Sequence, residues 1–310
     1  MARAWRAYQP RSRRRRRRAP AGVRTGGGSG VMASPGTVRA DFERIVRLPE
    51  SALDLARAAL LVAAESDPAV DVDSEAARLD RWAAEFSRRI EPGWNNLQKL
   101  ARLRAYVFED LGFVGDHEDY YHPDNSLLHR VMQRRRGVPL TLSIVFMEIG
   151  WRTGMPFEGV GFPGHFLVRL SGEPGDLLLD PYREGRSVHE DDCRRMLLEV
   201  SGGRLPFTPG LTASVGKRDM VLRLLHNLKG AWLRVGDDAQ ALAAVERLLV
   251  MRPGDAGETR DRGLLLYRLQ RYGLAMEALR DYLRRAPDAE DRDSVAAHLE
   301  RVMRLAAEMN

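Results

Sequence analysis

Apolar positions in the middle of the chain follow the spacing of a buried helix over residues 139–154. Pro139 suits a first helical turn, where a backbone N–H has no partner in any case. Gly154 is a natural C-terminal cap, because glycine adopts the left-handed backbone conformation without strain. The residues that recur at helical spacing are Leu142, Val145, Phe146, Ile149 and Gly150. The pattern predicts one apolar helix that ends at Gly154.

Three strands are predicted directly after this helix. Residues 157–162 are largely apolar and stop at the break formed by Pro163 and Gly164. Residues 165–170 partly alternate polar and apolar side chains, which is typical of a half-buried strand and makes His165 its first residue. Residues 177–180 form the third strand, which stops at Pro181. The stretch therefore predicts a buried helix followed by a small antiparallel sheet.

Helical periodicity also extends over the residues that precede this segment. The predicted helices cover residues 38–46, 53–64, 74–89 with Ser74 as the cap, a segment from Asn95 or Asn96 to Gly112, and residues 126–136. Asp124 or Asn125 is expected to cap the last of these, and Gly137 to end it. The apolar residues expected to face inward before Gly112 are Leu97, Leu100, Leu103, Val107 and Leu111.

A further helix and a linker are predicted after the strands. Residues 187–200 form the helix, with Ser187 as its cap and Met196, Leu197 and Val200 as its apolar positions. Residues 201–216 are rich in glycine and proline and are expected to be a linker.

The C-terminal part of the chain contains an internal repeat of 34 residues. A period of 34 residues is that of tetratricopeptide repeats, in which pairs of helices stack. Residues 295–309 are expected to form a capping helix, and so short an array is expected to dock on the preceding domain. The first repeat contributes Trp232, Gly236, Ala241, Ala244, Leu248 and Pro253, and the second Leu266, Gln270, Ala275, Ala278, Tyr282 and Pro287.

Together these elements predict an α+β protein with three parts. Residues 1–36 are a basic tail, residues 37–212 hold the helices, the buried helix and the sheet, and residues 213–310 are an all-α repeat domain. The tail is expected to be disordered, because it has too few apolar residues to offset the entropy lost on ordering. A translation start at Met32 is an alternative explanation of the tail.

The net positive charge of the chain comes from this tail. The formal net charge is +6, yet residues 1–36 contain ten arginines and no acidic residue, which leaves −4 on the other residues. A positively charged surface that binds nucleic acid is therefore not expected on the folded part. Only the tail has the charge to bind RNA, DNA or anionic lipid.

The single cysteine, Cys193, excludes an intramolecular disulfide and disfavours a zinc cluster. It fits a reducing compartment, so a cytoplasmic location is expected. The sequence contains no apolar run of the roughly 18 residues that a membrane span needs. Because Cys193 lies well after the buried helix, it is interpreted as structural.

The buried helix, a histidine before one strand and an aspartate at the end of the next resemble transglutaminase and papain-like cores. In those enzymes a cysteine at the start of the helix attacks a carbonyl, a histidine takes its proton, and an aspartate orients the histidine. His165 and Asp180 match the second and third members, but Pro139 stands at the nucleophile position. The resemblance therefore implies a degenerate triad of Pro139, His165 and Asp180.

A longer resemblance is carried by the strings PDNS, RRGVPLTLS, GVGFPGHFLVR and LDPY. They resemble the SirB-type bacterial proteins, which are transglutaminase-like, carry C-terminal tetratricopeptide repeats and are often labelled regulators of sirC expression. Proline at the nucleophile position is usual in that family. The resemblance implies a pseudoenzyme that acts through protein or peptide binding. The candidate binding residues in these strings are Asn125, Ser126, Gly137, Phe162 and His165.

Two other functions stay open. Thr141 and Ser143 lie in the first turns of the buried helix, and His165 could activate either hydroxyl in a hydrolase or acyltransferase. Ser143 is displaced by about 6 Å along the axis from Pro139, which argues against it. A nucleic-acid regulator is the third hypothesis, although no helix-turn-helix or zinc-finger pattern supports it.

No cofactor is expected. A metal site is conceivable in the acidic segment before the buried helix, but the ligand spacing there is irregular, and a polar surface loop explains the same residues. The side chains concerned are His117, Asp119, His122 and Asp124.

Overall fold

The computed structural model describes residues 35–172 and 175–308. The arginine-rich tail up to residue 34, with its expected disorder and the start at Met32, lies outside the described residues. Pro35 and Gly36, which composition assigns to the tail, form the first turn of helix α1.

Four α-helices come first. They are α1 (Pro35–Val46), α2 (Leu55–Ser66), α3 (Val72–Ser87) and α4 (Asn96–Arg104), and a π-helical segment η3 (Ala105–Asp110) continues α4. The predicted cap of α3 is wrong: the side chain of Asp71 accepts the N–H of Ser74, so the helix begins earlier. The predicted burial of Leu97 is also wrong, since it is 36% exposed on the outer side of α4.

The predicted helix over residues 126–136 is shorter than expected. A 3-10 turn, η4 (Pro123–Asn125), precedes α5 (Leu128–Arg134). Arg135, and not Gly137, adopts the left-handed conformation that ends the helix, with φ 58°. Gly137 instead belongs to β2 (Arg136–Gly137), which pairs in parallel with β1 (Val114–Gly115). Neither Asp124 nor Asn125 caps α5, which begins after Leu127 without a side-chain cap.

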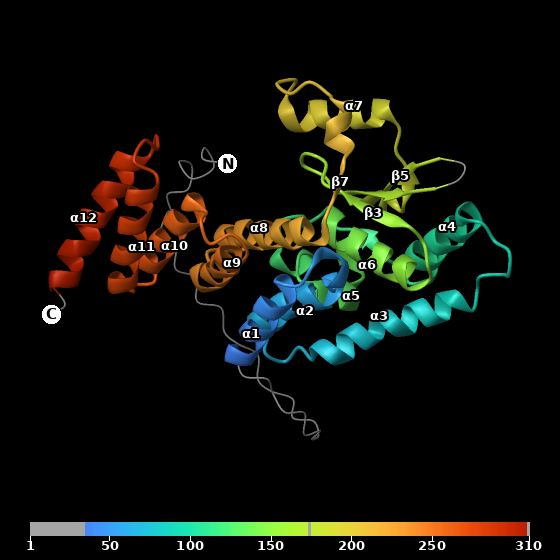
Figure 1. Cartoon of the computed structure of the whole chain (residues 1–310), viewed down its shortest axis with the longest axis horizontal. Helices are drawn as coiled ribbons and strands as arrows, with labels where there is room; N and C mark the ends of the chain where they lie inside the picture. Colours follow the sequence, from blue (N-terminus) through green and yellow to red (C-terminus); the bar gives the residue numbers. More distant parts are fainter. Residues whose placement is uncertain (1–34, 173–174, 309–310) are drawn as a thin grey trace, which may run out of the picture. The chain divides into compact units, whose positions relative to one another are not determined.

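The buried helix α6 (Pro139–Arg152) is the centre of the fold. Every residue from Pro139 to Gly150 is buried, including the polar Thr141, Ser143 and Glu148. It packs against α2, α3 and α5 and against strands β3 (Phe157–Val160) and β4 (Leu167–Leu170) (Figure 1). Pro139 occupies the first turn, and Gly154 follows the helix with φ 76°, as predicted.

The sheet has five antiparallel strands in the order β6-β5-β4-β3-β7. The strands not yet introduced are β5 (Leu177–Asp180), β6 (Arg186–Ser187) and β7 (Ser214–Val215). Three expectations are corrected. His165 precedes β4 and does not open it, Ser187 pairs in β6 and caps no helix, and the expected linker contributes β7.

Side chains alternate between the two faces of this sheet, and a helix covers each face. Val168 and Leu170 pack into the main core with α6, whereas Leu167 packs with α7 (Glu190–Ser201). Cys193, Met196 and Leu197 line the inner side of α7, but the apolar Val200 is 54% exposed.

The C-terminal helices stack as consecutive pairs. They are α8 (Lys217–Val235), α9 (Asp238–Met251), α10 (Ala256–Arg268), α11 (Tyr272–Arg285) and α12 (Arg292–Glu308), each packed on the next (Figure 1). Gly236 and Gln270, one repeat apart, both adopt the left-handed conformation between the helices of a pair. Helices α8 and α9 also pack against α2, so the first pair joins the main core, as the short array predicts. The fold is α+β.

Candidate functional site

His165 and Asp180 lie side by side, because the start of β4 pairs with the end of β5. His165 Nε2 is 2.9 Å from Asp180 Oδ1. The Asp180 side chain is 2% exposed and that of His165 is 13% exposed. The Nε2 atom makes no aligned hydrogen bond, so the contact has hydrogen-bond distance but not hydrogen-bond direction. The sequence spacing predicts this proximity.

Tyr182 covers the pair from the 3-10 turn η5 (Pro181–Arg183). Its ring meets that of His165 edge-on, with centroids 5.9 Å apart, and its N–H donates to Asp180 Oδ1. Its hydroxyl donates to the carbonyl oxygen of Asp116 at 2.8 Å and lies 3.0 Å from His117 Nδ1. Burial, followed by the charges around it, raises the pKa of Tyr182 to about 12. Tyr182 therefore stays a neutral donor at physiological pH.

The first turns of α6 carry two hydroxyl side chains and no thiol. Pro139 has no reactive side chain. The Thr141 hydroxyl donates to Asn125 O at 2.8 Å and accepts the N–H of Val138 at 3.2 Å, which closes the first turn of the helix. The Ser143 hydroxyl is fully buried and has no hydrogen-bond partner in the described part of the chain. Neither hydroxyl is bonded to His165.

Asn125 fastens the preceding loop to this helix start. Its side chain is fully buried, donates to Asp119 O at 2.7 Å and accepts from Arg134 at 3.2 Å. Ser126 is also buried, at 4% exposure. A Cβ on Gly137 would lie 2.7 Å from Thr141 Oγ1, so only glycine fits there. The structure thus places Asn125, Ser126 and Gly137 in the interior, where they shape the loop.

The loop of residues 116–122, here called the acidic loop, is held at its first residue. Burial alone raises the pKa of Asp116, but hydrogen bonds from Asp119, Asn125 and Glu118 and the charge of Arg134 outweigh burial, so this pKa lies below its usual value. Asp116 is therefore an ionised anchor for the loop.

Residues of the conceivable metal site serve other contacts. His117 faces the Tyr182 hydroxyl, and His122 Nδ1 accepts the N–H of Asp124. Within residues 35–172 and 175–308, no group of three or more histidine, cysteine or acidic side chains is arranged to hold a metal ion.

Arg223 of α8 reaches the turn that carries His165. Its Nη2 donates to Phe162 O at 3.0 Å and to His165 O at 2.6 Å. The Phe162 side chain is fully buried in the cluster that contains Cys193. Burial lowers the pKa of Arg223, and nearby Tyr120 partly offsets this. The sequence carries no local signal for this contact, because the partners lie 58 and 61 residues apart.

A second arginine of α8 contacts the acidic loop. The guanidinium carbon of Arg234 lies 3.8 Å from the ring centroid of Tyr121, which is 57% exposed. Arg223, Asn227, Gly230 and Arg234 recur along one side of α8, here called the α8 face. No heavy atom lies within 4 Å of a Cβ built on Gly230, so the middle of this face is open.

Cys193 is buried on α7, a different helix from α6. Burial, and then the acidic groups of Asp192 and Glu190, raise the pKa of its thiol. A raised pKa suppresses the thiolate that a nucleophile needs.

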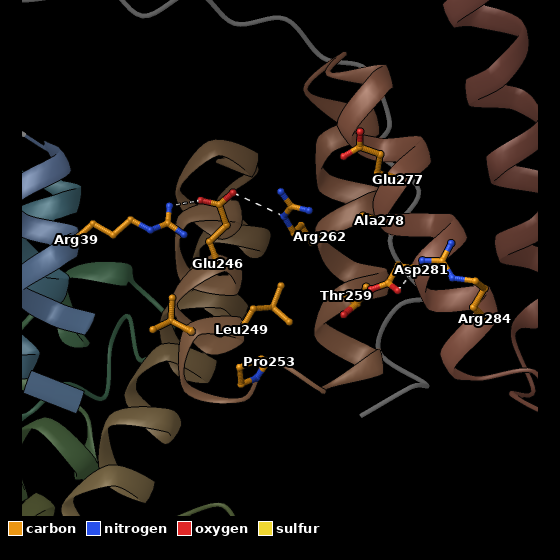
Figure 2. A pocket seen from close by; sticks show the side chains of 11 residues that line it. Arg39, Glu246, Leu249, Pro253, Thr259, Arg262, Glu277, Ala278, Asp281 and Arg284 are labelled. Atoms are coloured by element: carbon orange, nitrogen blue, oxygen red, sulfur yellow. Dashed lines mark hydrogen bonds and ion pairs between the residues drawn. The ribbon is translucent and has the colours of Figure 1, made fainter. Parts of the chain in front are cut away.

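Two hollows lie away from His165 and Asp180. The larger, of about 970 Å³, borders Trp151 of α6 and Lys217 of α8. The smaller, of about 540 Å³, lies among α1, α9, α10 and α11, where Figure 2 shows Arg39 and Arg262 on either side of Glu246. Arg39 pairs with Glu246 at 2.8 Å, and Asp281 pairs with Arg284 at 3.0 Å, so most charges of this hollow are neutralised locally.

Similar proteins identify the family. A UPF0162 protein of Xylella fastidiosa (strain 9a5c) is 31% identical over 261 residues, which cover 83% of this chain and 93% of that protein. The chain belongs to the UPF0162 protein family. Another UPF0162 protein, from Pseudomonas aeruginosa, is 31% identical over 215 residues, covering 69% of this chain and 78% of that protein.

Two family descriptions match consecutive parts of this UPF0162 chain. The transglutaminase-like superfamily matches residues 74–226, and the tetratricopeptide repeat matches residues 228–300. F-box only protein 21 of Homo sapiens is 28% identical over 149 residues, which are 46% of this chain and 23% of that protein. In the described part of the chain, no helix is both long and apolar enough to cross a membrane.

Proposed function

We propose that this UPF0162 chain is a non-catalytic transglutaminase-like protein that binds a protein or peptide partner through its repeat helices. A regulatory role of the kind attributed to the SirB-type proteins is part of the proposal. The lone, buried cysteine is compatible with action in a reducing, cytoplasmic environment.

One observation carries the proposal: the His165–Asp180 pair has no nucleophile bonded to it in the described residues. Pro139 occupies the nucleophile position, and the Thr141 hydroxyl is committed to the backbone of Val138 and Asn125. A general base must be within hydrogen-bond reach of the proton that it removes. In this arrangement His165 has no thiol or hydroxyl of the described residues within hydrogen-bond reach to activate, which supports a structural or binding role.

The alternative is a hydrolase or acyltransferase that uses Ser143 or Thr141. The 2.9 Å distance between His165 Nε2 and Asp180 Oδ1 favours it, since a carboxylate this close to a histidine can orient it as a base once the two groups align. Ser143 is fully buried, so a substrate reaches its hydroxyl only after α6 or the elements packed against α6 rearrange.

The catalytic half of the proposal is tested with activity assays. The unmodified protein is incubated with a glutamine-containing peptide and an amine, and separately with a p-nitrophenyl ester. The expected rates equal those of His165→Ala and of the buffer background. Turnover above background that is lost in both His165→Ala and Ser143→Ala establishes the enzyme instead.

The binding half is tested by selection from a phage-displayed random peptide library on the immobilised full chain. Gly230→Trp fills the open middle of the α8 face, and Gly273→Trp is the matched control, because Gly273 on α11 is equally exposed and open. Peptides are expected to be enriched on the unmodified protein and on Gly273→Trp, but not on Gly230→Trp. No enrichment, or equal enrichment on all three proteins, contradicts binding at this face.

A further inference from the structure

Arg234 has an unusual environment for an exposed arginine. Its guanidinium lies over the ring of Tyr121, and its N–H groups make no hydrogen bond or ion pair with any described residue. Glu118 pairs with Arg136 at 3.6 Å, and neither Glu118 nor Asp119 forms an ion pair with Arg234. The charge of Arg234 is therefore not neutralised by the acidic loop that it touches.

Stacking on a ring uses the face of a guanidinium and leaves its edge free. The planar edge carries N–H donors whose spacing matches the two oxygens of a carboxylate. Because the ring restricts the side chain before a ligand arrives, less conformational entropy is lost on binding. Tyr121 thus holds Arg234 in a form suited to a carboxylate.

The acidic residues of the neighbouring repeat helix do not compete for this charge. Glu258 and Asp261 of α10 lie within 2.7 Å and 2.5 Å of Lys229 Nζ, and Arg260 also pairs with Asp261. Arg223, the other arginine of the α8 face, forms no ion pair in the described residues and donates only to carbonyl oxygens. The face consequently carries two positive charges without acidic partners.

We propose that Arg234, stacked on Tyr121, binds the side-chain carboxylate of an aspartate or glutamate in a peptide that lies along the α8 face. The inference rests on the proposed binding function and adds the class of ligand. A side-chain carboxylate fits better than a chain terminus, because a peptide that lies along α8 passes both Arg234 and the open position of Gly230, one turn earlier on the same face.

The test uses the peptides selected from the displayed library, in which the random segment has no free C-terminal carboxylate. Aspartate or glutamate is expected to exceed its frequency in the unselected library at one position or more. The strongest peptide is then synthesised with an amidated C-terminus, and its Kd is measured by fluorescence anisotropy. Arg234→Gln is expected to weaken binding by about tenfold or more, the usual range for a hydrogen-bonded charge.

A double-mutant cycle separates a direct contact from a general loss of charge. Replacing the acidic residue of the peptide by its amide is expected to cost as much as Arg234→Gln, and to cost little in addition when Arg234 is already changed. Tyr121→Ala is expected to weaken binding less than Arg234→Gln, because it removes only the support. Thermal unfolding of each variant shows that the fold is retained.

Two results overturn the inference. They are selected peptides without acidic residues, and acidic peptides that bind equally to the unmodified protein and to Arg234→Gln. In each of these the proposed function stands if Gly230→Trp still abolishes binding. A library that yields no binder removes the proposed function as well.

Discussion

Arg223 of helix α8 donates a 2.6 Å hydrogen bond to the carbonyl oxygen of His165. Helix α8 begins within residues 74–226, which match the transglutaminase-like superfamily, and continues into the repeat match, and its Arg223 holds the turn that carries His165. The same side chain donates to Phe162 O, so both ends of the turn are fastened from one direction.

Arg223→Met is expected to loosen this turn. Two partly buried carbonyl oxygens lose their donor, which costs about 1–3 kcal/mol of unfolding free energy. Denaturant unfolding measures the loss, and hydrogen exchange is expected to speed up at residues 162–165. Arg44→Met is the control, because Arg44 is 68% exposed in its side chain and pairs only with Asp41 on its own helix. Equal effects of the two substitutions contradict the role given to Arg223.

Tyr182→Phe is expected to change how stability depends on pH. The folded chain keeps the Tyr182 proton up to a pKa of about 12, whereas an unfolded tyrosine loses it near pH 10. The unfolded state then binds fewer protons, so the stability of the unmodified protein falls as pH rises from about 10 to 12.

The phenylalanine variant lacks this dependence. At pH 9 it is expected to be about 1 kcal/mol less stable, since the bond to Asp116 O is lost. This difference is expected to shrink by about 1 kcal/mol at pH 11. Between pH 7 and pH 9 the difference stays constant, because tyrosine remains protonated in both states. A difference that is unchanged at pH 11 excludes the raised pKa.

Gln270 and Gly236 of the repeat both adopt the left-handed conformation, and substitutions at these two positions are expected to change stability in opposite directions. Gln270 adopts φ 59°, where a side chain costs about 1 kcal/mol, so Gln270→Gly is expected to stabilise the chain by up to that amount. Gly236→Ala is expected to destabilise it by about 1 kcal/mol, although no atom lies within 4 Å of the added Cβ. Denaturant midpoints of both variants measure the effects. Shifts of the same sign show that backbone conformation is not the cause.

Pro139→Cys tests whether the site keeps the arrangement of an enzyme. Cysteine can replace proline in a first helical turn without loss of a hydrogen bond, so the variant is expected to fold. The helix N-terminus and the His165–Asp180 pair are expected to lower the pKa of the new thiol below about 8.5 and to speed its alkylation. His165→Ala in the same background is expected to reverse part of this effect. An ordinary thiol pKa means that the histidine and aspartate have only a structural role.

Much of the fold follows from local patterns. The apolar spacing of residues 139–150 predicts α6, and Gly154 ends it, because periodicity and backbone freedom are properties of neighbouring residues. The errors lie at element ends. Asp71 caps α3 in place of Ser74, and Arg135 ends α5 in place of Gly137. Several residues near an end can serve as a cap, and packing selects among them.

Part of the candidate site also follows from sequence patterns. The spacing of His165 and Asp180 predicts their approach, since two adjacent antiparallel strands bring such positions together. The 34-residue period likewise specifies the helix pairs of the repeat.

Only the tertiary structure brings Arg223 to the His165 turn, Tyr182 to the acidic loop and Arg234 to Tyr121. These partners lie 58, 66 and 113 residues apart along the chain. No periodicity links such positions. The contacts of Arg223 and Arg234 depend on how α8 docks against the core, and the contact of Tyr182 depends on how η5 packs beside β1. This packing follows from the burial of whole apolar faces, which decides where the polar side chains come to lie.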